Sequence, residues 1–361
     1  MMEINLSGKE KKIPLLKRVK HKIFFLFRLN DHPVIKVYNG FGNDQKIIVM
    51  GHVFKLSPMP RKTYRKNWIT NLFSILRLFM VIPFSNANIR IEWMENIYYT
   101  EAEKDGFFRL EIFPEEALKI GWQLVSVTLN ESWSYLSDIK GHGHIYIPFA
   151  SQHAFISDID DTFLISHSSR LRKRLYVLFT KNAHTRKPFA GVVNHYQLLA
   201  ASNQPANQEN PFFYVSGSEW NLYDFIVEFS VANELPKGIF LLSQLKGLMS
   251  FWKSGQTGLT TKFMRITRII ELFPHLRFVL LGDDSQKDPV IYLSIVSHFP
   301  DKILAVYIRA VHQSNSEKTQ LIIKEMESKG ISCCYFKHSA EAVIHSKVIG
   351  LIIENDDLLN V

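Results

Sequence analysis

Residues 155–162 read Phe-Ile-Ser-Asp-Ile-Asp-Asp-Thr, and this stretch decides the fold because it places a cluster of acids directly after a short apolar strand. We expect that strand over residues 154–159. Asp158 and Asp160 stand two positions apart, so their carboxylates point the same way in an extended backbone. One can act as a nucleophile and the other as a general acid and base. Because two carboxylates repel an anionic substrate, we also expect Mg²⁺, which prefers all-oxygen sites.

The chain after residue 150 alternates between short apolar strands and helices. Strands are expected at 154–159, 212–215, 238–242, 277–281, 303–308 and 331–335, and helices at 261–273, from 288 onward, at 316–329 and at 340–349. This alternation predicts an α/β fold, a Rossmann-like parallel sheet with helices on both faces. Ligands of such sheets bind at the carboxyl ends of the strands, which is where the acids after residue 157 lie.

Further polar residues follow two other expected strands. Ser216 and Gly217 offer a hydroxyl and backbone N–H groups that can cradle a phosphate, although an ordinary turn is the alternative. Asp283 and Asp288 follow the strand at 277–281 and can complete a metal site, although a Gly-Asp-Asp stretch is also typical of a turn with a helix cap. Each signal is weak alone, and their common position after strands strengthens them.

A lysine is expected to face the same site from a helix. Lys262 is predicted to lie at a helix N-terminus, where its charge opposes the helix dipole unless an anion lies nearby. Arg265 and Arg268 are rivals for this role, and simple solvation is the alternative.

In this order the residues resemble the motifs of the haloacid dehalogenase superfamily. The sequence is more closely similar to one branch, the actin-patch-type phosphatidate phosphatase family. The resemblance covers roughly residues 150–310 and is carried by ISDIDDT (156–162), RKPFAGV (186–192), FFYVSGSEWNLYDFI (212–226) and LLGDDSQKDPVIY (280–292).

The resemblance implies Mg²⁺-dependent hydrolysis of a phosphate monoester, phosphatidate in the first place, through an aspartyl-phosphate. On that pattern Asp158 is the nucleophile and Asp160 the acid and base. The phosphoryl group is then bound by Thr162, Ser216, Gly217 and Lys262, and the metal by Asp158, Asp160, Asp283 and Asp288. Asp284 stands where the family usually has Ser or Gly, which leaves open which acids of this stretch reach the metal.

Residues 33–149 carry short alternating strands separated by turn signals, which predicts a small, mainly β, sandwich-like domain ahead of a catalytic domain at 150–361. An apolar helix is expected to interrupt it at about 66–82. Its basic flank also fits a helix lying in a membrane interface, but packing within the domain is favoured. Residues 1–32 are predicted to form a basic arm.

Positive charge is concentrated in two segments. Residues 1–36 hold nine Lys and Arg against three acids, and residues 162–208 hold seven Lys and Arg and no acid. Such segments attract anionic membranes, nucleic acid or phosphorylated substrates. We expect an anionic membrane surface as a partner, and no nucleic acid, because no nucleic-acid-reading motif accompanies the charge.

The compartment follows from what the sequence lacks. Its two cysteines are adjacent and cannot form a disulfide framework, and no signal peptide is evident. We therefore expect a cytoplasmic protein, peripheral on the inner membrane. Two other functions remain open: the same chemistry on a soluble phosphomonoester, and a membrane-binding adaptor with an idle phosphatase site. The oligomeric state is not predicted.

Overall fold

The structure is a computed structural model that describes residues 29–30, 32–58, 77–130, 139–149, 153–159, 188–204, 208–245, 257–285 and 287–353. Several predicted features lie outside these residues: nearly all of the basic arm, Asp160, Thr162, the basic residues at 170–187, and most of the apolar segment at 66–82. None of the helices in the described part of the chain combines the length and the apolar composition that a membrane span requires.

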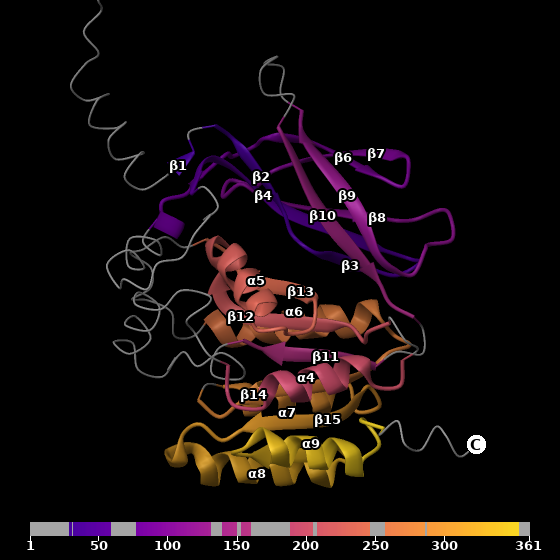
Figure 1. Ribbon diagram of the computed structural model, residues 1–361, viewed down its shortest axis with the longest axis vertical. Coiled ribbons are helices and arrows are strands. Elements are labelled where there is room, and N and C mark those ends of the chain that lie inside the picture. Colours follow the sequence, from indigo (N-terminus) through magenta and orange to yellow (C-terminus); the bar gives the residue numbers. More distant parts are fainter. Residues whose placement is uncertain are drawn as a thin grey trace, which may run out of the picture.

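The C-terminal part is built on a parallel sheet, as the alternating pattern predicts (Figure 1). Six strands of the described residues form it: β11 (His153–Asp158), β12 (Phe212–Glu219), β13 (Gly238–Ser243), β14 (Arg277–Asp283), β15 (Ile303–Arg309) and β16 (Ser332–Phe336). Their order is β13-β12-β11-β14-β15-β16. The chain therefore runs outward from β11 in one direction and from β14 in the other, and these two neighbours mark the switch point where such sheets bind ligands.

Helices cover both faces of this sheet. They are α4 (Val192–Ala201), α5 (Tyr223–Ala232), α6 (Thr257–Leu272), α7 (Asp288–His298), α8 (Ser316–Ser328) and α9 (Ser339–Val348). Right-handed crossovers place α4 and α5 on one face and α6, α7 and α8 on the other. Contacts between α4 and α9, and between α7 and its neighbours α6 and α8, agree with this division.

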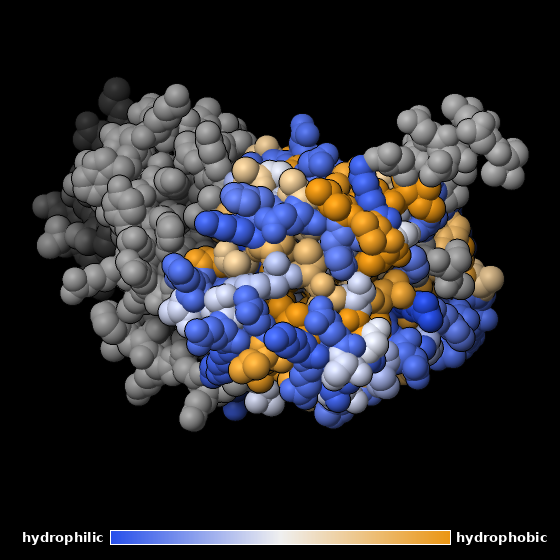
Figure 2. Space-filling view, turned by 90° about the horizontal axis from the view of Figure 1, so that it is seen from below, coloured by the Kyte–Doolittle hydropathy of each residue, from blue (hydrophilic) through white to orange (hydrophobic). Residues whose placement is uncertain are grey.

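The outer surface of this part reflects the amphipathic pattern of its helices. Helix α8 turns Thr319, Ile323 and Met326 inward, at the spacing of one helical face. Seen from the side of α8 and α9, the surface is largely hydrophilic with scattered apolar patches (Figure 2). Leu321, exposed by 68%, is one of the apolar residues left outside, which is ordinary for a folded protein.

The N-terminal part is mainly β, as predicted. Its strands form one mixed sheet, and among the described residues they are β1 (Leu29–Asn30), β2 (Val34–Val37), β3 (Gly40–Gly42), β4 (Ile47–Pro58), β5 (Ile82–Pro83), β6 (Asn88–Trp93), β7 (Asn96–Glu101), β8 (Phe107–Ile112), β9 (Gly121–Leu129) and β10 (Lys140–Ile147). Strand β4 is 12 residues long and pairs with β1, β2, β3, β5 and β8 along its length. We call this part the β domain below.

The expected helix at about 66–82 is wrong at its C-terminal end. Arg77 and Leu78 are helical, but Ile82 and Pro83 form strand β5, paired antiparallel with β4. The physical reason is that proline cannot continue a helix, whereas it is tolerated at a sheet edge.

The hydrophobic core runs across the junction of the two parts. Tyr38, Phe41 and Tyr146 of the β domain belong to the same buried cluster as the strands of the parallel sheet. A second cluster, which includes Val49 and Val127, lies within the β domain alone. The two sheets are therefore joined by shared packing.

Candidate active site

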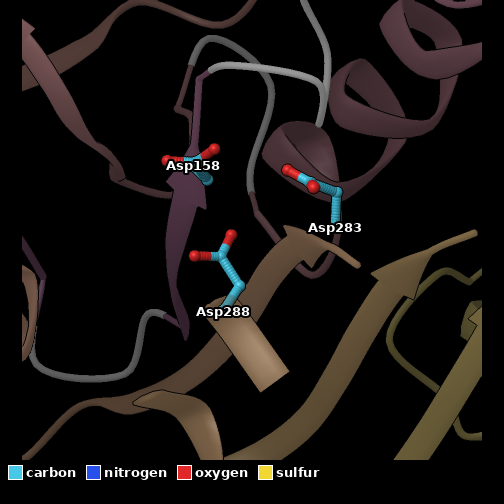
Figure 3. A group of neighbouring side chains, drawn as sticks. All are labelled: Asp158, Asp283 and Asp288. Carbon is cyan, nitrogen blue, oxygen red and sulfur yellow. The ribbon is translucent and has the colours of Figure 1, made fainter. Parts of the chain in front are cut away.

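Three carboxylates meet at the switch point of the parallel sheet (Figure 3). Asp158 ends β11, Asp283 ends β14, and Asp288 opens α7. Their ligand oxygens lie within 4.8 Å of one another, and all three residues are buried. A Cβ at Gly282 would come within 2.7 Å of Asp288 Oδ2, so only glycine leaves room for this approach. The structure therefore brings together three of the four predicted metal ligands, while Asp160 lies outside the described residues.

Lys262 is the cation of this group. Its Nζ donates to Asp158 Oδ1 at 2.7 Å and to Asp288 Oδ1 at 2.5 Å. Burial acts to lower the pKa of Lys262, but the two carboxylates outweigh burial and the pKa is raised. Lys262 is therefore held as an ammonium ion against the candidate nucleophile.

The prediction that Lys262 lies at a helix N-terminus is wrong. Helix α6 begins at Thr257, so Lys262 lies in its second turn and not at its N-terminus. A positive charge is stabilised at this position by the ion pairs with Asp158 and Asp288, and the helix dipole is not needed to explain it. Of the three rival basic residues, Arg265 contacts the strand ends beside the site and Arg268 is exposed.

These residues could hold a metal ion. Within the described part of the chain, the Lys262 ammonium group forms ion pairs with two of the three carboxylates, Asp158 and Asp288. Burial, followed by the neighbouring Asp288, raises the pKa of Asp283 to about 7. Within the described part of the chain, Asp288 Oδ2 is a buried oxygen with no hydrogen-bond partner. A hard divalent cation would use that oxygen and offset the charge.

Asp284 belongs to a different structure. Its Oδ1 accepts the N–H groups of Val311 at 2.7 Å and His312 at 2.9 Å, and its Oδ2 accepts the Tyr335 hydroxyl at 2.7 Å. Its side chain therefore ties β14 to the chain that follows β15 and to β16. This answers the question that the sequence left open: Asp283 and Asp288 lie with Asp158, and Asp284 does not.

Ser216 lies beside Asp158 at the same edge of the sheet. The register partner of Asp158 on β12 is Val215, so Ser216 is one position beyond it. Ser216 is buried and its Oγ accepts the N–H of Ser218 at 2.9 Å. Gly217 is exposed, with open space where a side chain would be. The order of Ser216, Gly217 and Ser218 fits a phosphate cradle next to the three carboxylates.

Arg265, named from the sequence as a rival of Lys262, supports the site in another way: its Nη1 donates to the Ser216 carbonyl oxygen at 2.9 Å. One further supporting residue was missed from the sequence. Ser157 donates to the Asp158 carbonyl oxygen at 2.7 Å and contacts the Tyr196 hydroxyl at 2.8 Å. No sequence signal identifies Ser157, because its partner Tyr196 comes from α4.

The site thus consists of a buried aspartate, a lysine and two further acids at the switch point of a parallel α/β sheet. Residues 153–310 match the family model described as the catalytic domain of phosphatidate phosphatase APP1. This match confirms the family resemblance that the motifs indicated, and the family is one of phosphatases.

One curated relative is phosphatidate phosphatase APP1 of Saccharomyces cerevisiae, 32% identical over 165 residues, which are 45% of this chain and 26% of the relative. The chain thus spans about a quarter of that relative's length. Two solved structures are similar at a low level. A carbohydrate acetylesterase from Xanthomonas citri gives a TM-score of 0.33 at 10% identity, covering 88% of this chain and 75% of the other. A bacterial ice-binding adhesin gives a TM-score of 0.19 at 11% identity, covering 35% of this chain and 34% of the other. Likeness at this level carries no argument.

Proposed function

We propose that this protein is a Mg²⁺-dependent phosphatidate phosphatase that releases phosphate and diacylglycerol through an aspartyl-phosphate at a membrane surface. The observation that carries the proposal is the buried contact between Lys262 Nζ and Asp158 Oδ1 at 2.7 Å, beside two further acids. It supplies a carboxylate and a cation at one point, next to a candidate phosphate cradle.

The chemistry uses the chain's own groups as follows. Asp158 attacks phosphorus, the bond from phosphorus to the lipid oxygen breaks, and Asp160 protonates the departing oxygen. Asp160 then takes a proton from water, which attacks the phosphorus of the aspartyl-phosphate and frees Asp158. Lys262 and Ser216 hold the phosphoryl oxygens throughout.

A metal ion completes this proposal. Asp158, Asp283 and Asp288 would hold it, with Asp160 as the fourth ligand that the family motif implies. Mg²⁺ would supply positive charge between the carboxylates and the phosphate, and Thr162 and Gly217 would add contacts to the phosphoryl group.

The family match supports a lipid phosphate as substrate. The basic segments at 1–36 and 162–208 support docking on an anionic membrane, in keeping with a cytoplasmic protein that is peripheral on the inner membrane. No nucleic-acid partner is expected.

A substrate panel tests the lipid assignment. Purified protein with Mg²⁺ is assayed for phosphate release from phosphatidate in mixed micelles and from soluble sugar phosphates, nucleotides and phosphopeptides. We expect phosphatidate to give the highest kcat/KM and anionic vesicles to increase it. Preference for a soluble monoester, with no response to vesicles, would support the alternative that the protein hydrolyses a soluble phosphomonoester. Vesicle binding without turnover of any substrate would support the adaptor.

A further inference from the structure

An aromatic stack joins the β domain to the segment that follows the candidate phosphate cradle. Trp220, six per cent exposed, directly follows β12 and lies four residues after Ser216. Its ring stacks on Tyr38 at 4.2 Å with an angle of 10° between the planes. Phe107 at 5.9 Å and His52 at 6.2 Å, also from the β domain, close around it. Trp220 therefore packs against the β domain.

Tyr38 is itself held in place. It is one per cent exposed, and its hydroxyl lies 3.0 Å from His52 Nδ1. The next residue, Asn39, donates its backbone N–H to the Tyr223 hydroxyl at 3.2 Å and its side-chain amide to the Gly238 carbonyl oxygen at 2.9 Å. Tyr38 is therefore a rigid support, because contacts on both sides restrict it.

The segment between Ser216 and Trp220 needs support of this kind. On β12, Val215 pairs with Leu241 and Glu219 pairs with Ser243, so three residues lie opposite one and the register shifts. Such a bulge lacks regular ladder hydrogen bonds between its ends. Arg265 holds its beginning through the Ser216 carbonyl, and the Trp220 stack holds its end.

We propose that Tyr38 is a positioning residue of the phosphate site: through its stack on Trp220, the β domain sets the conformation of residues 216–219. This inference rests on the proposed function, because it assigns residues 216–219 to phosphate binding. It also means that the part of the chain matching the catalytic-domain family does not form a complete site without the β domain.

A matched pair of substitutions in the full-length chain tests the proposal. Tyr38→Leu removes the stack. Tyr146→Leu is the control: Tyr146 is also buried in the β domain and packs into the same core, but its hydroxyl donates to the Glu209 carbonyl oxygen, before the start of β12. Tyr38→Phe keeps the ring and removes only the hydroxyl. Each variant is measured for melting temperature, for kcat and KM with Mg²⁺, and for binding of inorganic phosphate by calorimetry.

We expect both leucine variants to melt at lower temperature, but only Tyr38→Leu to weaken phosphate binding, by about tenfold or more, with Tyr38→Phe close to wild type. Equal phosphate binding in the two leucine variants would overturn the proposal. Should Tyr38→Leu fail to fold, Trp220→Phe takes its place, with weaker phosphate binding again expected and unchanged binding contradicting it. A wild-type protein that neither binds nor releases phosphate would instead refute the proposed function.

Discussion

At the scale of single residues, charge balance explains the candidate site. Asp158, Asp283 and Asp288 converge in a buried space, where like charges repel strongly and water cannot screen them. Lys262 offsets part of this repulsion through two short contacts. The pKa of Asp283 is raised first by burial and then by the repulsion from Asp288 that Lys262 does not offset. The arrangement is one that a divalent cation would relax.

Substitution of the two adjacent acids at the end of β14, Asp283 and Asp284, should have different effects on Mg²⁺ affinity and on stability. Asp283→Ala is expected to reduce Mg²⁺ affinity by about tenfold or more. Its effect on stability without metal should be smaller than that of Asp284→Ala, because the loss of the hydrogen bond from the Ser285 N–H is offset by relief of the repulsion with Asp288. Asp284→Ala is expected to leave two backbone N–H groups without their acceptor and to lower the free energy of unfolding by about 2 kcal/mol, with Mg²⁺ affinity nearly unchanged. Urea unfolding without metal and calorimetric Mg²⁺ titration give the two readings. Loss of Mg²⁺ binding in Asp284→Ala would show that Asp284 is a ligand.

Much of the site could be predicted from the sequence at this scale. The part that could not be predicted depends on contacts between residues that are distant in sequence. Asp158, Asp283 and Asp288 lie at or just after the ends of strands that periodicity identifies, so their convergence follows from the parallel sheet. Asp283 faces the candidate metal site while Asp284 has a structural role, and this difference depends on Tyr335 and on the chain after β15, which are distant in sequence. No local pattern carries that information.

At the scale of elements, helix α6 links the cation to the phosphate cradle. Lys262 and Arg265 stand three positions apart, so they lie on one face of the helix. Lys262 pairs with the acids, while Arg265 contacts the Ser216 carbonyl oxygen and, at 3.4 Å, Ser243 Oγ. Burial, followed by the charge of Arg268, lowers the pKa of Arg265 to about 10. Arg265 still carries its charge at neutral pH.

Substitutions along α6 test this role of Arg265. Arg265→Gln is expected to raise the inhibition constant of inorganic phosphate by about tenfold, because the Ser216 backbone loses its charged donor. Arg265→Lys keeps the charge but not the planar fork, so an intermediate value is expected. Arg268→Gln, one turn further along, serves as the control and should behave as wild type. An Arg265→Gln variant with unchanged phosphate inhibition would remove Arg265 from the account.

The strands after residue 150 were predicted within a few residues, and the differences have physical causes. Strand β12 continues through its bulge to Glu219, four residues beyond the predicted end, because hydrophobic runs do not reveal bulges. Helix α4 was not predicted, although Val192, Tyr196 and Leu199 keep helical spacing. Strand β7 was also missed; four of its six residues are exposed, so alternation is weak.

At the scale of the whole molecule, a shared core joins the two sheets. The fold class followed from strand and helix alternation, but the junction did not. Tyr38 and Trp220 are far apart in sequence, and nothing local in either segment signals their stacking. Residues 153–310 carry the family signature, and the β domain supplies contacts that the signature does not include.

Each part also buries a neutral histidine, which predicts a pH effect on stability. Burial, followed by Lys36, lowers the pKa of His52 to about 3. Burial, followed by Arg309 and His345, lowers the pKa of His195 to about 3. Below about pH 6.5 the unfolded chain takes up protons that the folded protein does not. The free energy of unfolding should therefore fall between pH 6.5 and about 3, by up to about 1.4 kcal/mol per pH unit for each histidine.

Chemical denaturation at pH 7, 6 and 5 measures this effect. The difference between wild type and His52→Gln isolates one histidine, since the other titrating groups are common to both. We expect wild type to lose more stability than His52→Gln on acidification, and His142→Gln, at an exposed position of β10, to follow wild type. If wild type and His52→Gln lost equal stability on acidification, buried His52 would not be a source of the pH effect.

The central claim is that Asp158 forms an aspartyl-phosphate with the help of a divalent cation. The most direct measurement is Mg²⁺-dependent phosphate release from phosphatidate by wild type and by Asp158→Asn, an isosteric change that removes the nucleophile. We expect wild type to release phosphate until Mg²⁺ is chelated, and Asp158→Asn to lose at least about a thousandfold of this activity. Wild-type activity retained in Asp158→Asn, at equal folding, would contradict it.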